Sequence, residues 1–278
     1  MVVLILGARG QFGTALEARC VARNIAYLSP PHAVADITDG LALASYVDAV
    51  QPSVIVNAAG FIDFPGCERD PKRAFAINTT AVRGLANICK KRNLPLVQTS
   101  THLIFSGNKN TPYTEKDMPQ PNSIYAASKF VGETIALTRN PQSYIVRFST
   151  LFGSRRNCRL GFIERMTQHL KNNEPLAISA DRVDSPTWAI DAADQVLNIV
   201  REKWPFGVYH VANSGHASYF ETIRYLANLV NSKSSLSAAR ETDFQSDPPK
   251  PLKVAITSIK LRPIRGWKEA LSAYVSTI

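Results

Sequence analysis

A tyrosine and a lysine four residues apart, Tyr125 and Lys129, are the pair in this sequence best suited to acid–base chemistry. Residues at this spacing on a helix lie on one face, one turn apart. An ammonium group beside a phenol favours the phenolate, so we expect Lys129 to lower the pKa of Tyr125 from about 10 toward neutral pH. A phenol tuned in this way can act as a general acid toward a substrate carbonyl.

Two hydroxyl groups stand a short way upstream of this pair. Ser100 and Thr101 end the apolar run 94–101, which reads as a buried strand. Ligands of open α/β sheets bind at the carboxyl ends of the strands. We therefore expect the hydroxyl of Thr101 to lie in the same site as Tyr125.

The N-terminus carries a glycine turn between an apolar run and a helical pattern. Gly7, Gly10 and Gly13 follow residues 2–6 and precede a helix predicted from Thr14 to about Arg23. The strand, turn and helix context makes this glycine spacing informative. Glycines permit the tight turn and let backbone N–H groups approach a pyrophosphate at the helix N-terminus. The pattern predicts a dinucleotide cofactor.

The next elements bear on which dinucleotide binds. A short strand near residues 25–28 ends in Ser29 without the Asp or Glu that would bind the ribose 2′-hydroxyl of NAD. Ser29 and Arg9 could instead bind a 2′-phosphate, which favours NADP over NAD. The apolar run 53–60 ends in three small residues that allow close approach of a cofactor, namely Ala58, Ala59 and Gly60.

The elements that position these residues alternate between strand and helix. Apolar runs at 2–6, 25–28, 53–60, 94–101 and 144–148 are followed by helical patterns at 14–23, 41–50, 74–92 and 125–137. Asp39 or Thr38 could cap the second of these helices. This rhythm predicts an α/β, Rossmann-like fold with a doubly wound parallel sheet.

After Gly153 the regular alternation of strands and helices ends. Further elements are predicted as helices at 162–171, 191–202, 219–230 and 267–275, short strands at 176–178 and 207–211, and an extended linker at 247–251. We expect residues 1–152 to form an NAD(P)-binding domain to which residues 187–213 return. Residues 153–186 and 214–278 are expected to form a smaller α/β lobe that binds the substrate.

Composition is ordinary for a globular chain of 278 residues, with 45% hydrophobic and 19% charged residues. No targeting signal or apolar run of membrane-spanning length is present, and the four cysteines are widely spaced. These features predict a cytoplasmic location, no membrane association and no metal site.

The formal net charge of +10 could attract an anion. The run 90–92 suits a solvated helix end, whereas Arg155, Arg156 and Arg159 follow a predicted strand and could bind an anionic ligand. Nothing resembles a nucleic-acid-binding module, so we expect a small-molecule partner and no nucleic acid. A homodimer is the commonest expectation for the assembly.

Several motifs, taken in order along nearly the whole chain, resemble one family, the dTDP-4-dehydrorhamnose reductases of the extended short-chain dehydrogenase/reductase class. They are GARGQFG (7–13), VIVNAAG (54–60), the Ser-Thr pair (100–101), YAASK (125–129), DSPTW (184–188), GVYHVANSG (207–215) and WKEAL (267–271). The resemblance implies an NAD(P)H-dependent oxidoreductase that reduces the 4-keto group of a nucleotide-linked deoxysugar in deoxysugar or polysaccharide biosynthesis. The substrate would be dTDP-4-dehydro-L-rhamnose or a related sugar.

The resemblance also implies roles for individual residues. Thr101 would hydrogen-bond the ketone oxygen, Tyr125 would donate the proton, and Lys129 would hold the nicotinamide ribose. The pyrophosphate would be lined by Gly7, Gly10, Gln11 and Phe12, and the adenine bordered by Asp36 and Ile37. Ala58, Ala59 and Gly60 would pack under the cofactor, and Thr99 is a further cofactor-binding candidate.

This chain departs from the family pattern around the sugar. The family's Ser-Thr-Asp-Tyr-Val-Phe is Ser-Thr-His-Leu-Ile-Phe at 100–105, and Thr150 stands where a tryptophan is usual. His102 and Thr150 are therefore candidate substrate-binding residues in an altered sugar pocket. The family's Val-Asp after the third strand is Phe64-Pro65, and Ala15 replaces an acidic residue that some members use in a magnesium-bridged dimer, with Glu17 nearby.

Two other hypotheses assume the same fold but a different function. A nucleotide-sugar epimerase or dehydratase would hold NAD⁺ tightly, but the dehydratase pattern Thr-Asp-Glu before the tyrosine is absent. A non-catalytic regulatory subunit, like the β subunit of methionine adenosyltransferase, would not need Tyr125 and Lys129, and both are present. Fold alone does not separate these readings.

Overall fold

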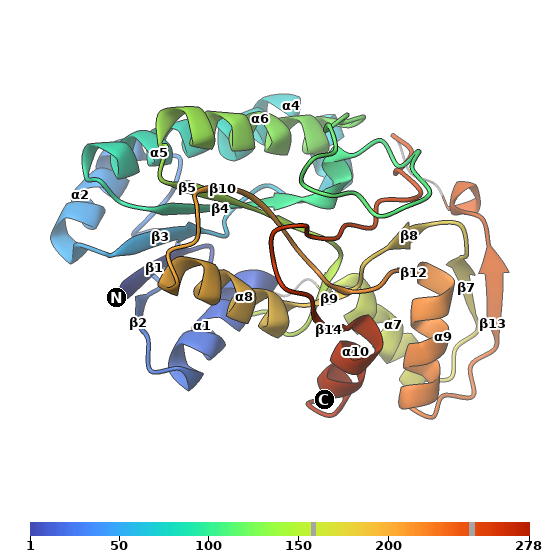
Figure 1. Cartoon of the computed structure of the whole chain (residues 1–278). Helices are drawn as coiled ribbons and strands as arrows, with labels where there is room; N and C mark the ends of the chain where they lie inside the picture. Colours follow the sequence, from blue (N-terminus) through green and yellow to red (C-terminus); the bar gives the residue numbers. More distant parts are fainter. Residues whose placement is uncertain (157–159, 245–247) are drawn as a thin grey trace.

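A computed structural model of the chain describes residues 1–156, 160–244 and 248–278. Its centre is a six-stranded parallel sheet in the order β10-β5-β4-β3-β1-β2 (Figure 1). The strands are β1 (Val2–Leu6), β2 (Ala26–Leu28), β3 (Val54–Asn57), β4 (Leu96–Thr101), β5 (Ser143–Phe148) and β10 (Gly207–Val211). The predicted α/β fold with a doubly wound parallel sheet is confirmed.

Helices cover both faces of the sheet (Figure 1). One face packs against α1 (Gln11–Ala22) and α8 (Ala189–Arg201), and the other against α2 (Gly40–Val50), α5 (Ala81–Lys91) and α6 (Ile124–Arg139). Strand β1 shows why: Val3 and Ile5 belong to the first core, whereas Leu4 and Leu6 belong to the second. Side chains alternate across a strand, so an unbroken apolar run requires cover on both sides.

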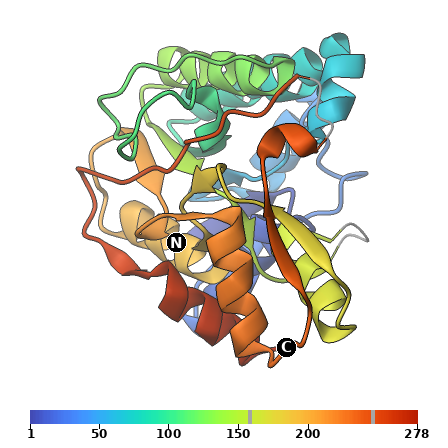
Figure 2. The same ribbon diagram turned by 90° about the vertical axis from the view of Figure 1, so that its right-hand side faces the viewer.

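The C-terminal part builds a separate core beyond the carboxyl edge of the sheet. Helices α7 (Phe162–Lys171), α9 (Tyr219–Leu229) and α10 (Trp267–Val275) enclose it, and it includes Phe152, Ile163 and Trp267. Strand β7 (Leu176–Ser179) pairs in parallel with β13 (Leu236–Ala239), and Figure 2 shows the two side by side.

Short strand pairs connect this lobe to the sheet. Strand β6 (Leu151–Phe152) pairs with β9 (Thr187–Trp188), β8 (Val183–Asp184) with β12 (Ala217–Ser218), and β11 (Asn213–Ser214) with β14 (Ile264–Gly266). Because β6 follows β5 directly and β9 leads into α8, the chain enters and leaves the lobe beside the sheet's carboxyl edge. Two 3₁₀ turns complete the described elements, at His102–Ile104 and Glu241–Asp243.

The predicted elements agree with the structure except at a few boundaries. Helix α1 begins at Gln11 rather than Thr14, and Asp39 caps α2 by accepting hydrogen bonds from the N–H groups of Leu41 and Ala42 at 3.2 and 3.0 Å. The short helix α3 (Phe64–Arg69), which has a proline in its first turn, was not predicted. Of the predicted linker, Asp247 lies outside the described residues.

The segment predicted as helical over 74–92 is helical in the structure, but it is not one regular α-helix. The chain forms α4 (Pro71–Phe75), then a π-helix (Ala76–Thr80), then α5. A single turn of π-helix widens the backbone locally and commonly marks a functional site.

Among the described residues, none of the helices combines the length and hydrophobicity needed to cross a membrane. Within the same ranges there is also no group of three or more His, Cys, Asp or Glu side chains arranged to hold a metal ion.

Candidate active site

The tyrosine, the lysine and the threonine meet at the carboxyl edge of the sheet. Ser123 caps α6 by accepting a hydrogen bond from the Ala126 N–H at 3.2 Å, and this fixes where the helix begins. Tyr125 and Lys129 then lie on its inner face, 9% and 6% exposed. Thr101 ends β4, is 6% exposed, and its side chain lies close enough to the Tyr125 hydroxyl to lower the pKa of that phenol. The structure therefore brings two buried hydroxyls together one helical turn from a lysine.

The expected lowering of the Tyr125 pKa is wrong for this chain without cofactor. Burial raises the pKa of Tyr125 to about 12, the Thr101 hydrogen bond lowers it in part, and the nearby Cys67 raises it further. Lys129 does not contribute to this pKa shift, and its ammonium donates a hydrogen bond to the Thr99 carbonyl at 2.7 Å. Tyr125 is consequently a fully protonated phenol at neutral pH, which is the form that a proton donor requires.

Lys129 is buried deeply enough to change its own acidity. Removal from water is the main cause that lowers its pKa to about 8, while Glu133 opposes this change. Thr99, which accepts its hydrogen bond, is itself held by a bond from its hydroxyl to the Asn57 carbonyl at 2.9 Å. Thr99 thus contacts both Lys129 and the end of β3.

Asn78, in the π-helix, organises the backbone around the lysine. Its side-chain oxygen accepts a hydrogen bond from the Phe61 N–H at 2.9 Å, and its amide donates to the Phe61 carbonyl at 2.9 Å and to Ser128 at 3.1 Å. Gly132 of α6 lies so close that a Cβ there would be 2.2 Å from the Asn78 carbonyl oxygen. The widened turn lets helix α6 pack directly against the Asn78 backbone.

The glycine turn lies at the same edge of the sheet. Gly7 has φ +83°, and a Cβ there would be 2.5 Å from the Ala59 nitrogen, so no larger residue fits without a shift. Gly10 is the N-cap of α1 and offers no side-chain cap, which leaves the first N–H groups of a 12-residue helix without that partner. Phe12 packs into the core beside Phe148, with ring centroids 4.6 Å apart. This arrangement fits a dinucleotide pyrophosphate.

The two candidates for a 2′-phosphate come from neighbouring turns. Arg9 follows β1 and Ser29 follows β2, and these strands pair in parallel, so both residues emerge at one edge. Arg9 is exposed and Ser29 is partly buried. Beyond them, the Asp36 carboxylate accepts two hydrogen bonds from Thr38 at 2.8 Å, and Ile37 packs into the core.

Three small residues continue this edge after β3. The Ala58 N–H donates to the Leu6 carbonyl at 2.8 Å, and the Ala59 N–H donates to the Asn57 side chain at 3.1 Å. A Cβ on Gly60 would lie 3.7 Å from Lys129 Nζ. The segment 58–60 therefore connects the glycine turn to the lysine.

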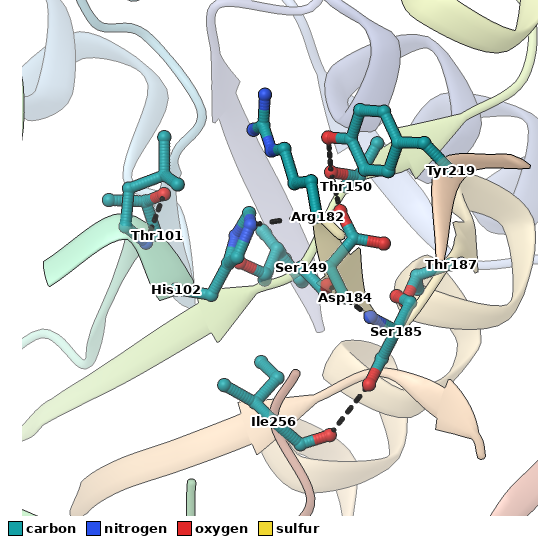
Figure 3. A network of polar contacts seen from close by, with 12 residues as sticks. Thr101, His102, Ser149, Thr150, Arg182, Asp184, Ser185, Thr187, Tyr219 and Ile256 are labelled. Atoms are coloured by element: carbon teal, nitrogen blue, oxygen red, sulfur yellow. Dashed lines mark hydrogen bonds and ion pairs between the residues drawn. The ribbon is translucent and has the colours of Figure 1, made fainter. Parts of the chain in front are cut away.

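The two residues predicted to contact substrate lie in one polar network (Figure 3). His102 is buried, and its Nδ1 is 3.0 Å from the Phe148 carbonyl oxygen. The Thr150 hydroxyl hydrogen-bonds Asp184 and is 3.2 Å from the Tyr219 hydroxyl. Both residues thus occur beyond Thr101, toward the C-terminal lobe.

The basic run after β6 contacts the glycine turn. Arg156 donates to the Ala8 carbonyl at 3.1 Å and pairs with Glu17, and Arg155 donates to the Gln11 side chain at 2.8 Å. Arg159 lies outside the described residues. Gln11 also donates to the Gly153 carbonyl at 2.9 Å, so the turn is held to the segment that leads into the lobe.

Two residues in this region were not predicted to belong to the site, although Asp184 begins the DSPTW motif. Asn78 is marked only by an Ala-Ile-Asn-Thr-Thr interruption in an otherwise helical pattern. Asp184 lies in a two-residue strand whose type cannot be read from periodicity. Both are buried polar residues, 2% and 1% exposed, whose partners come from distant parts of the chain.

Comparison with known proteins assigns the chain to a family. The sequence model described as "RmlD substrate binding domain" matches residues 1–278. The chain belongs to this family. Among curated relatives, a dTDP-4-dehydrorhamnose reductase of Aggregatibacter actinomycetemcomitans is 32% identical over 79% of this chain and 76% of its own. A dTDP-4-keto-6-deoxy-D-glucose reductase of Streptomyces niveus is 31% identical over 82% and 78%.

Solved structures of RmlD family proteins agree over the full length. The dTDP-4-dehydrorhamnose reductase of Bacillus anthracis, determined in complex with NADP, has a TM-score of 0.94 at 25% identity and covers 100% of this chain and 99% of its own. The Clostridium acetobutylicum protein of the same name has a TM-score of 0.93 at 28% identity, with the same coverage. The resemblance stated from the motifs is confirmed.

Proposed function

We propose that this chain is an NAD(P)H-dependent oxidoreductase that reduces the 4-keto group of a nucleotide-activated deoxysugar. The observation that carries the proposal is the placement of buried Thr101 beside buried Tyr125, one turn from Lys129, at the edge where the glycine turn lies. The substrate class rests on the relatives, which are named as reductases of dTDP-4-dehydrorhamnose and of dTDP-4-keto-6-deoxy-D-glucose.

The residues around the glycine turn fit a nicotinamide dinucleotide, which supplies the hydride when bound. We assign the pyrophosphate to Gly7, Gly10, Gln11 and Phe12, the adenine border to Asp36 and Ile37, and the floor of the site to Ala58, Ala59, Gly60 and Thr99. Arg9 and Ser29 favour NADP because they offer a cation and a hydroxyl where NAD would need an acidic residue. The NADP bound to the Bacillus anthracis protein supports this choice.

The proton step belongs to Tyr125. As hydride reaches the carbonyl carbon, negative charge develops on the oxygen, and hydroxyl groups aimed at that oxygen stabilise it. Tyr125 transfers its phenolic proton to this oxygen, and Thr101 donates a second hydrogen bond. The phenolate left behind needs a nearby cation, which is the role we assign to Lys129 once its ammonium is drawn from the Thr99 carbonyl.

The cores of the parallel sheet and of the C-terminal lobe suggest which part of the chain binds each ligand. We propose that residues 1–152, with 187–213, bind the cofactor, and that residues 153–186 and 214–278 bind the sugar nucleotide. Thr150 and His102 lie between these parts and are assigned to the substrate. A cytoplasmic location and a homodimer are the remaining proposals, the first because the widely spaced cysteines suit a reducing compartment and the second because C₂ dimers are the commonest assemblies.

The test is oxidation of NADPH and of NADH by purified protein supplied with dTDP-4-dehydro-L-rhamnose. Tyr125→Phe should lower kcat by about 10²–10⁴-fold, which is the usual contribution of a general acid. Tyr144→Phe is the matched control, because its hydroxyl bonds the Trp204 carbonyl at 2.9 Å near the other end of β5.

Three results would refute the proposal. A Tyr125→Phe enzyme within threefold of wild type would remove the tyrosine from the reaction. Protein that carries bound NAD⁺ and does not consume NADPH would indicate an epimerase or dehydratase. Protein that binds neither cofactor would indicate a regulatory subunit.

A further inference from the structure

A cluster of buried polar side chains lies between Thr101 and the C-terminal lobe, and the reduction step does not use it. It contains His102, Thr150, Arg182, Asp184 and Tyr219, which come from four separate segments of the chain (Figure 3). The side chains of His102, Arg182 and Asp184 are 6%, 8% and 1% exposed. Burial of so much hydrogen-bonding capacity is costly unless each group finds a partner.

Three atoms of this cluster lack such a partner. Within the described ranges, no hydrogen bond is made by His102 Nε2, Arg182 Nε or Asp184 Oδ1. The other polar atoms of the same side chains are bonded: His102 to Phe148, Arg182 to Glu241 at 3.2 Å, and Asp184 to Thr150. Each of the three side chains is therefore held through one polar atom, while a second polar atom is buried and unpaired.

The open atoms have defined hydrogen-bonding character. A carbonyl only accepts, so His102 Nδ1 must carry the proton that it shares with Phe148. Burial, with a further effect of Arg182, lowers the pKa of His102 to about 3, so the ring is neutral and its Nε2 is an acceptor. Asp184 Oδ1 is a second acceptor, while Arg182 Nε–H is a donor.

The acceptors cannot satisfy each other. His102 Nε2 is 3.9 Å from Asp184 Oδ2, and that oxygen already accepts the Thr150 hydroxyl. The Tyr219 hydroxyl, 3.2 Å from Thr150, completes a chain that fixes the Asp184 carboxylate. A group that both donates and accepts is needed to pair the open atoms.

The backbone that carries these groups is braced. The Ser185 N–H donates to the Ser149 hydroxyl at 3.0 Å, and the Ser185 hydroxyl donates to the Ile256 carbonyl at 3.1 Å. The Arg182 guanidinium lies over the Tyr219 ring at 4.5 Å. Side chains held in this way keep their unpaired atoms in place, as a preorganised binding site requires.

We propose that Asp184 and Arg182, with His102, form a hydroxyl-binding pocket that selects the sugar ring. A ring hydroxyl donates its proton to Asp184 Oδ1 or His102 Nε2 and accepts from Arg182 Nε. A sugar with hydrogen in place of that hydroxyl leaves the buried atoms unpaired, and sites of this kind reject such analogues strongly. This inference rests on the proposed function and names Asp184 and Arg182 as its specificity-determining residues.

The experiment compares sugars and variants together. Wild type, Asp184→Asn and the control Asp194→Asn are assayed with a nucleotide-linked 4-keto-6-deoxysugar and with its 2-deoxy and 3-deoxy analogues. The control makes the same chemical change in the Asp194–Arg19 ion pair, at 2.8 Å, which joins α8 to α1 on one face of the sheet. Binding of the reduced product sugars to the NADP-loaded protein is measured by calorimetry.

We expect wild type to bind one deoxy analogue about 10- to 100-fold more weakly than the parent sugar, as the loss of a hydrogen bond that leaves buried polar atoms unpaired implies. Asp184→Asn should raise KM and the product Kd for the parent sugar by a similar factor. It should leave kcat within about threefold and the NADPH affinity unchanged. The Asp184→Asn variant and wild type should bind the analogue that lacks the recognised hydroxyl with the same affinity. Asp194→Asn should have the wild-type KM, kcat and Kd for every sugar.

Wild-type protein that binds all the parent and deoxy sugars equally would overturn the inference, and this measurement does not depend on any variant folding. An Asp184→Asn variant that weakens every sugar by the same factor would also overturn it, because a structural role predicts that pattern. If wild type binds NADPH but no nucleotide sugar, the proposed function fails together with the pocket. Normal turnover without hydroxyl discrimination refutes the pocket alone.

Discussion

Replacing Gly132 by alanine tests whether contact between α6 and the π-helix positions the reactive groups. Gly132 lies one turn beyond Lys129 on the buried side of α6. A Cβ at this position would be 2.2 Å from the Asn78 carbonyl oxygen. That oxygen belongs to the backbone, so it cannot rotate away, and an ordinary contact of this kind requires about 3.3 Å or more. The helix or the π-turn must therefore move by about 1 Å.

The magnitude follows from two opposing effects. Alanine is favoured over glycine inside a helix by about 1 kcal/mol. Forcing an extra methyl group into a packed core usually costs about 1–3 kcal/mol, and here the obstacle is backbone. We expect Gly132→Ala to lower the free energy of unfolding by about 1–3 kcal/mol. A displacement of about 1 Å in Tyr125 and Lys129 should also reduce kcat, by up to about 100-fold.

Gly84→Ala is the matched control. Gly84 lies in the middle of α5, and a Cβ there would meet nothing within 4 Å. This change should raise the free energy of unfolding by about 0.5–1 kcal/mol and leave kcat unaltered. Urea denaturation and NADPH oxidation measure both effects. If Gly132→Ala stabilises the protein as Gly84→Ala does and keeps wild-type kcat, the proposed role of the close contact is wrong.

Two further predictions concern buried charges. Because burial lowers the pKa of Lys129 from 10.5 to about 8, the unfolded chain binds one more proton than the folded chain between these pH values. The stability of wild type relative to Lys129→Met should therefore rise by about 1–2 kcal/mol from pH 8 to pH 9.5, and a flat or falling difference in urea denaturation would contradict the assignment. Glu133 pairs with Arg147 at 2.7 Å in the core, so Glu133→Ala should cost about 3–5 kcal/mol by stranding the guanidinium. Asp48→Ala, at the exposed pair with Arg92, should have a much smaller effect in the same thermal melts, and equal losses would argue against burial as the cause.

Local patterns predicted much of the fold correctly. The apolar runs of β1, β3 and β5 mark strands buried on both faces, and the glycine turn marks the start of α1. Helices α7 and α10 and strand β10 begin and end at the predicted residues. These elements carry their own periodicity, so one window of sequence is sufficient to recognise them.

The errors arise where distant segments decide the local structure. The π-helix forms around Asn78, whose partners Phe61 and Ser128 are 17 and 50 residues away. The predicted shift in the pKa of Tyr125 had the wrong direction. Sequence spacing reveals that a lysine is close, but it does not reveal which acceptor the lysine faces or how deeply the phenol is buried. The unpaired atoms of Asp184 likewise depend on tertiary packing, which leaves no periodic trace.

The position of β10 has a consequence for synthesis on the ribosome. This strand pairs with β5 at the edge of the sheet, yet 58 residues separate the end of β5 from its first residue, Gly207. A nascent chain that ends shortly after β5 therefore presents the unpaired edge of an otherwise folded parallel sheet. That edge stays open until the intervening part of the lobe and α8 have emerged, which at ordinary rates of translation takes several seconds. This interval is when the polypeptide is most exposed to aggregation, and when a chaperone would be most useful to it.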